Sequence, residues 1–171
     1  MINSRYPLSE AWLYFVVLLL IPVFAASSWA ANPPQSYDDI KPFLPDTTIL
    51  QNKVVYLDFW ASWCTPCQKS FPWMQSLYDE YHNRGLEVIA VSLDKKKQAA
   101  DKFLSDNEVS FPIVYDSTGT LAKKFNLEAM PSSFLYGRDG KLKSSNKGFK
   151  EDEAENLKFT IEDLLSEELV K

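Results

Sequence analysis

The feature that most constrains this chain is a pair of cysteines three residues apart, directly after an apolar run. Cys64 and Cys67 are the only cysteines among its 171 residues. The preceding run, residues 54–60, is typical of a strand buried on both faces, and the following residues have helical spacing. Two sulfurs in the first turn of a helix can form a disulfide and reopen with little backbone movement, and the free N–H groups there stabilise a thiolate. We therefore predict thiol–disulfide exchange, with Cys64 attacking and Cys67 resolving.

Three other interpretations of the pair compete with redox chemistry. A structural disulfide over so short a loop would gain little stability. A zinc site needs four ligands, and the only histidine, His82, is expected to face solvent. The third interpretation is two unreactive thiols in a core. The order of strand, Cys-x-x-Cys and helix favours the redox interpretation, and no metal site is predicted.

Length and composition indicate the class of protein. The apolar content of 46% suits one well-cored domain plus a targeting segment. The formal net charge of −5 argues against nucleic acid as a partner, because binding phosphates requires a basic surface. We expect a monomer.

The N-terminal residues are typical of a targeting segment. Residues 11–26 carry no charge, and Ser28 and Ala30 have the spacing that a signal peptidase recognises. The apolar run is shorter than the roughly 18–20 residues of a spanning helix, and Pro22 interrupts it. We predict a signal peptide over residues 1–30, with a retained membrane anchor as the alternative. The folded part is then exported to a periplasmic or extracytoplasmic location.

The rest of the chain has the pattern of an α/β domain. Residues 31–52 are predicted to form an extended lead-in, with a helical turn in 37–44 and a short edge strand at 47–50. The domain proper is 53–171. Its further expected strands are 86–93, 111–115, 132–136 and one ending near 147, and its expected helices lie after Cys67, around 99–104, at 121–125 and at 151–168. This order implies a central mixed β-sheet flanked by helices, with the cysteines at the carboxyl end of a central strand.

Residues 54–67, Val-Val-Tyr-Leu-Asp-Phe-Trp-Ala-Ser-Trp-Cys-Thr-Pro-Cys, resemble the active-site segment of the thioredoxin superfamily. The chain most resembles its TlpA/ResA-like exported thiol:disulfide oxidoreductases, over about residues 53–148. The resemblance implies a thioredoxin fold and a role in cell redox homeostasis. The helix and strand expected within residues 95–115 resemble the insertion of that branch.

The resemblance also implies roles for residues outside the cysteine pair. Asp58 matches the buried acid that takes the proton of the second cysteine, and a carboxyl sealed there should have a raised pKa. Pro131 matches a cis-proline facing the sulfurs, beside which the Met130 backbone would pair with an extended substrate. Pro72 matches a helix-kinking proline. The remaining expected substrate contacts are Trp63, Thr65, Pro66 and Gly148.

Two departures from the family pattern concern the charge around the site. Ser70 stands where ResA-like proteins carry a glutamate, and Ala90 where thioredoxins carry a lysine. Asp58 is therefore expected to be the acid that tunes the cysteines. Strong oxidants of the superfamily tend to carry a histidine between the two cysteines, and none lies there in this chain, so the resemblance favours a reductant over a disulfide oxidase or isomerase.

The predicted function is reduction of protein or peptide disulfides by the Cys64–Cys67 dithiol, without a metal or an organic cofactor. The resemblance implies a membrane thiol transporter as electron donor. Besides the oxidase or isomerase, the alternatives are a thiol peroxidase and a redox-inactive binding module. The substrate is not indicated by the sequence.

Overall fold

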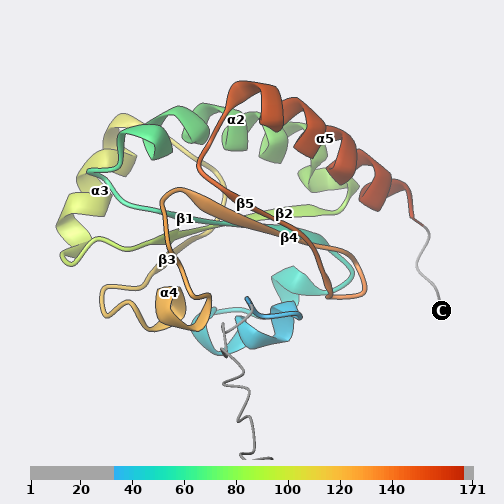
Figure 1. The fold of residues 1–171 in the computed structure, drawn as a ribbon, viewed down its shortest axis with the longest axis horizontal. Helices are drawn as coiled ribbons and strands as arrows, with labels where there is room; N and C mark the ends of the chain where they lie inside the picture. The colour runs from blue at the N-terminus through green and yellow to red at the C-terminus, as the bar shows by residue number, and fades with distance from the viewer. Residues whose placement is uncertain (1–32, 168–171) are drawn as a thin grey trace, which may run out of the picture. The chain divides into compact units, whose positions relative to one another are not determined.

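The computed structural model describes residues 33–167, which form a five-stranded mixed sheet (Figure 1). The strand order is β3-β2-β1-β4-β5. β1 pairs in parallel with β2, and β2 with β3, whereas β4 runs antiparallel to both β1 and β5. The strands are β1 (Val54–Trp60), β2 (Leu86–Ser92), β3 (Ile113–Tyr115), β4 (Ser132–Tyr136) and β5 (Leu142–Lys147).

Helices cover both faces of this sheet, as Figure 1 shows. Side chains from α2, α3 and α5 pack on one face, and α4 packs on the other together with residues from the 37–50 segment. The helices are α2 (Thr65–Tyr81), α3 (Lys97–Asp106), α4 (Thr120–Lys124) and α5 (Glu151–Ser166). The predicted fold class is confirmed, and so are the helix and the strand expected within residues 95–115.

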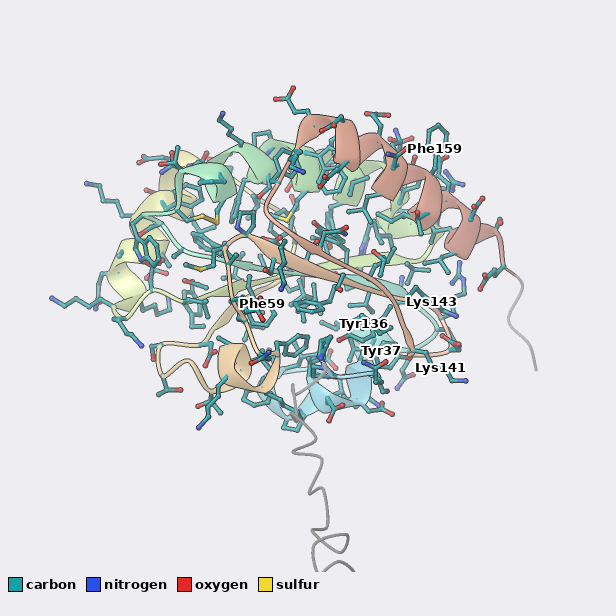
Figure 2. All side chains as sticks on the ribbon, viewed as in Figure 1. Tyr37, Phe59, Tyr136, Lys141, Lys143 and Phe159 are labelled. Atoms are coloured by element: carbon teal, nitrogen blue, oxygen red, sulfur yellow. A yellow bond between two sulfur atoms is a disulfide. The ribbon has the colours of Figure 1, made fainter. Side chains whose placement is uncertain are left out.

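The central strand β1 is buried along its whole length because both of its faces are covered. Val54, Tyr56 and Trp60 point toward α2 and α5. Phe59 points the other way, into the layer that also holds Tyr136 (Figure 2). This two-sided burial explains why β1 is a nearly unbroken apolar run rather than an alternating one.

Residues 33–53 fold against the sheet rather than forming an extended lead-in. They contain three 3-10 turns, η2 (Tyr37–Asp39), η3 (Lys41–Phe43) and η4 (Thr48–Leu50). The predicted helical turn is confirmed, but the predicted edge strand at 47–50 is wrong. There the Asp46 carboxylate accepts bonds from the N–H and the hydroxyl of Thr48 at 2.8 and 2.7 Å, which starts a turn. Leu50 is consequently buried in the core.

The predicted signal peptide lies outside the described residues. Within residues 33–167, no helix is long and apolar enough to cross a membrane.

Arg138 joins three segments of the chain at the end of the sheet opposite the cysteines, including the last turn of α5. Its guanidinium donates to the carbonyls of Asn52, Arg84 and Leu165, at 2.7, 3.1 and 3.2 Å. It lies against Gly85, which ends the short turn η5 (His82–Arg84) with φ +105°. A Cβ added at Gly85 would lie 2.7 Å from Nη1 of Arg138.

A Gly85→Ala variant is therefore expected to lose about 2 kcal/mol of unfolding free energy, partly from the left-handed backbone and partly from displacing Arg138. Gly119→Ala is the matched control, because Gly119 also has positive φ (+73°) but no heavy atom of the described chain lies within 4 Å of its added Cβ. Urea unfolding of both variants measures the difference. Equal losses would contradict a tightly packed Arg138.

Candidate active site

The two cysteines form a disulfide at the N-terminus of α2. Cys64 is the N-cap residue, and its Sγ accepts the N–H of Cys67 at 3.3 Å. A sulfur in this position receives a helix N–H directly, which is the arrangement that stabilises a thiolate. Cys64 is 5% exposed and Cys67 is fully buried, so Cys64 is the sulfur nearer to solvent.

The motif places polar and aromatic surface around Cys64. Trp63 is 67% exposed, and Thr65 and Pro66 are exposed as well. Trp60 is instead a core residue, with its ring centroid 4.7 Å from that of Phe71. The structure thus places one tryptophan of the motif at the surface and the other in the core.

Asp58 lies on β1 and is 1% exposed. Its side chain belongs to the even-numbered row of β1, on the sheet face that α2 covers. Its Oδ2 has no hydrogen-bond partner among residues 33–167. Burial raises the pKa of this carboxyl well above its usual value, which confirms the predicted direction of the shift.

The predicted proline directly precedes β4, the strand that pairs antiparallel with β1. The Met130–Pro131 peptide bond is cis. The Pro131 carbonyl accepts the N–H of Gly148 at 2.7 Å, and Gly148 has φ +83° with no described heavy atom within 4 Å of an added Cβ. Met130 is half-buried and packs against the apolar cluster that contains both cysteines. These three residues thus come together at the start of β4 and the end of β5.

The two positions that depart from the family pattern are uncharged and buried. Ser70 donates its hydroxyl to the Cys67 carbonyl at 2.9 Å. Ala90 on β2 is the register partner of Asp58 and is fully buried. Pro72 lies inside α2, where the resemblance placed it.

A contact that the sequence did not reveal holds the loop between β1 and α2. The Asp94 carboxylate accepts the backbone N–H and the hydroxyl of Ser62, at 2.9 and 2.8 Å. The Ser62 carbonyl in turn accepts the Gln68 amide at 3.2 Å. Asp94 is 5% exposed and follows β2 at the same edge of the sheet as the cysteines. The sequence signal that could have indicated Asp94 is its position directly after a central parallel strand, where open α/β sheets place their functional residues.

The profile of the AhpC/TSA family matches residues 43–145 of this fold, which is more than half of the chain. The chain belongs to the AhpC/TSA family. Solved structures are similar to it as well. A structure titled a putative thiol:disulfide interchange protein DsbE, from Chlorobium tepidum, has a TM-score of 0.67 and 39% identity, covering 70% of this chain and 84% of that one. StoA from Bacillus subtilis has a TM-score of 0.56 and 34% identity, covering 64% and 82%.

Curated relatives carry the name thiol-disulfide oxidoreductase ResA. The one from Bacillus thuringiensis subsp. konkukian is 37% identical over 98 residues, which are 57% of each chain. The one from Bacillus subtilis is 34% identical over 93 residues, 54% of this chain and 52% of that protein. The matched part thus spans little more than half the length of these relatives. The predicted resemblance and the thioredoxin-type fold are both confirmed.

Proposed function

We propose that this protein is a thiol:disulfide oxidoreductase whose redox centre is Cys64–Cys67. The observation that carries the proposal is the disulfide at the N-terminus of α2, in which the less buried sulfur caps the helix. The names of the ResA relatives and of the DsbE-like structure support the same activity.

The exchange follows from the positions of the two sulfurs. In the reduced protein, Cys64 thiolate attacks one sulfur of a substrate disulfide and expels the other as a thiolate. Cys67 then gives its proton to Asp58 and attacks Cys64, which releases the second substrate sulfur and forms the internal disulfide. Two electrons pass from the protein to the substrate. No metal or organic cofactor takes part.

We further propose that the protein acts as an exported reductant of protein or peptide disulfides. The Thr65-Pro66 dipeptide supports this direction, because it lacks a histidine that would stabilise the reduced form. Trp63 and the Met130 backbone offer a surface for an extended segment. Electrons would come from a membrane thiol transporter, and export rests on the N-terminal sequence.

The equilibrium reduction potential of Cys64–Cys67 tests this function. Residues 31–171 would be titrated in glutathione buffers while tryptophan fluorescence is followed, with Cys64→Ser as the control that cannot form the bond. A potential below about −230 mV is expected for a reductant. A value above about −180 mV would place the protein among oxidases or isomerases. The absence of a two-electron transition would refute the redox assignment.

A further inference from the structure

A row of polar side chains leads from Asp58 to the edge of the sheet. In the strand register Asp58 pairs with Ser133 on β4, and Ser133 pairs with Asn146 on β5. Directly paired residues point to the same face, with Cβ atoms about 4.5–5.5 Å apart, so the three side chains form one continuous row. Exposure increases along it, from the fully buried Asp58 and buried Ser133 to the half-buried Asn146.

The row of polar side chains does not continue on the other side of Asp58. Its partner there is Ala90, a fully buried residue without a polar atom in its side chain. The polar continuation of the row therefore runs in one direction only, toward β5.

A small cavity lies where this row approaches the surface. Its volume is about 20 Å³, enough for one water molecule, and its lining includes Tyr56, Ser133 and Asn146. Lys150 and Glu153 line it at the start of α5 and are exposed. The cavity is thus lined both by Ser133, the second member of the row, and by residues that are exposed to solvent.

We propose that Asp58 exchanges its proton with solvent through Ser133 and the cavity beside Asn146, and not past the disulfide. The inference rests on the proposed function, because it concerns the proton that Cys67 loses in that reaction. Asp58 needs such an outlet, since its Oδ2 meets no partner in the described chain and its surroundings on the cysteine side are apolar.

Few other groups around Asp58 could accept its proton. Tyr56 faces it from β1, and burial and the nearby Asp58 charge raise the pKa of that phenol well above its usual value, so it stays protonated. Cys67 lies on α2, and Ala90 and Ser133 are the neighbours on β2 and β4. At the cavity mouth Lys150 and Glu153 are paired at 2.5 Å.

Each turnover then moves one proton along a defined path. Cys67 transfers its thiol proton to the Asp58 carboxylate, and the new thiolate forms the S–S bond with Cys64 while the bound thiol leaves as a thiolate. Asp58 can accept this proton only after it has released its own to solvent, so a slow outlet slows the resolving step. Ser133 and Asn146 are positioning residues in this scheme, because they carry or orient the proton path and touch neither sulfur.

Stopped-flow reaction of the reduced protein with dithiobis(nitrobenzoate) separates the two chemical steps. The first thionitrobenzoate is released when Cys64 attacks, and the second when Cys67 resolves the mixed disulfide. We expect Ser133→Ala and Asn146→Leu to slow the second release about tenfold at pH 7 and to leave the first unchanged. The slowing should vanish at high pH, where hydroxide takes the Cys67 proton directly. A purely structural defect would persist at every pH.

Ser145→Ala is the matched control, since Ser145 is exposed on β5 and pairs with Phe134 on the opposite face of the sheet. Its second release should keep the wild-type rate. The proton path would be overturned if Asn146→Leu kept the wild-type rate of the second release, or if Ser145→Ala slowed it equally. Either result would leave the proposed function intact. If the wild-type protein released no thionitrobenzoate, the proposed function itself would fall, and this inference with it.

Discussion

An Asp58→Asn variant is expected to resolve mixed disulfides about 100-fold more slowly than the wild-type protein at pH 7. Asparagine keeps the size of the side chain but cannot accept the proton that Cys67 must lose. The attack by Cys64 should keep its rate, because its thiolate is stabilised by the N-terminus of α2 and not by Asp58. The second release of thionitrobenzoate measures the loss.

The same variant is expected to be more stable than the wild-type protein at pH 8. The pKa of Asp58 is raised by burial above its ordinary value of 3.8, so the folded state binds its proton more tightly than the unfolded chain does. Its contribution to stability is greatest below pH 3.8 and declines as the pH rises toward the native pKa. Asparagine removes this decline, and urea unfolding at pH 8 and pH 4 should show a gain only at the higher pH.

Asp116→Asn provides the matched control for both effects. Asp116 is also buried, at 5% exposure, but its Oδ2 accepts the N–H of Ala122 at 2.9 Å. Losing this hydrogen-bonded charge should lower stability and alter neither release of thionitrobenzoate. An Asp58→Asn protein that resolves mixed disulfides at the wild-type rate would show that Asp58 is not the proton acceptor.

Most of the fold and the centre of the site could be predicted from local sequence patterns. The apolar run of β1, the cysteine spacing and the helical stripe after it are all contained in residues 54–81, so they could be recognised without knowing the tertiary structure. The cis bond before Pro131 was predicted because the resemblance supplied it, since proline alone does not distinguish cis from trans.

Contacts between distant segments were not predictable in the same way. The bonds between Ser62 and Asp94 join residues 32 positions apart, and the row from Asp58 to Asn146 depends on the register of three strands. A one-residue shift in either pairing would point Ser133 or Asn146 to the other face. The edge strand expected at 47–50 failed for a local reason, because Asp46 starts a turn there.

His82 takes part in another contact that the sequence did not predict. It was expected to face solvent, but it is half-buried and its ring lies 4.4 Å from that of Tyr78. Its Nδ1 is 3.7 Å from Oε2 of Glu87 on β2. Glu87 is only 3% exposed, and its Oε1 has no hydrogen-bond partner anywhere in residues 33–167.

Glu87→Gln is expected to raise the unfolding free energy at pH 8 by up to about 3.5 kcal/mol, at about 1.4 kcal/mol per pKa unit. Burial raises the pKa of Glu87 from 4.5 to about 7, with a smaller opposing contribution from Lys53. The folded protein thus keeps this proton up to a higher pH than the unfolded chain does. The stability that the proton contributes is therefore lost as the pH rises from about 4.5 to about 7. Glutamine removes the charge that must otherwise be buried without a strong partner.

Urea unfolding of the wild-type and Glu87→Gln proteins between pH 4 and pH 8 measures this effect. The two curves should meet near pH 4 and diverge through pH 7. His82→Gln separates the contribution of the neighbouring ring, because it keeps Glu87 but removes the only cation-forming group within 4 Å of its carboxylate in the described chain. Since Glu87 lies at the start of β2, away from the cysteines at the other end of β1, both releases of thionitrobenzoate should keep their rates in these variants. If the unfolding free energy of Glu87→Gln ran parallel to that of the wild type across this pH range, Glu87 would already be solvated and charged in the folded protein. A change in the rate of the second release would mean that the charge of Glu87 acts on the redox centre through the sheet.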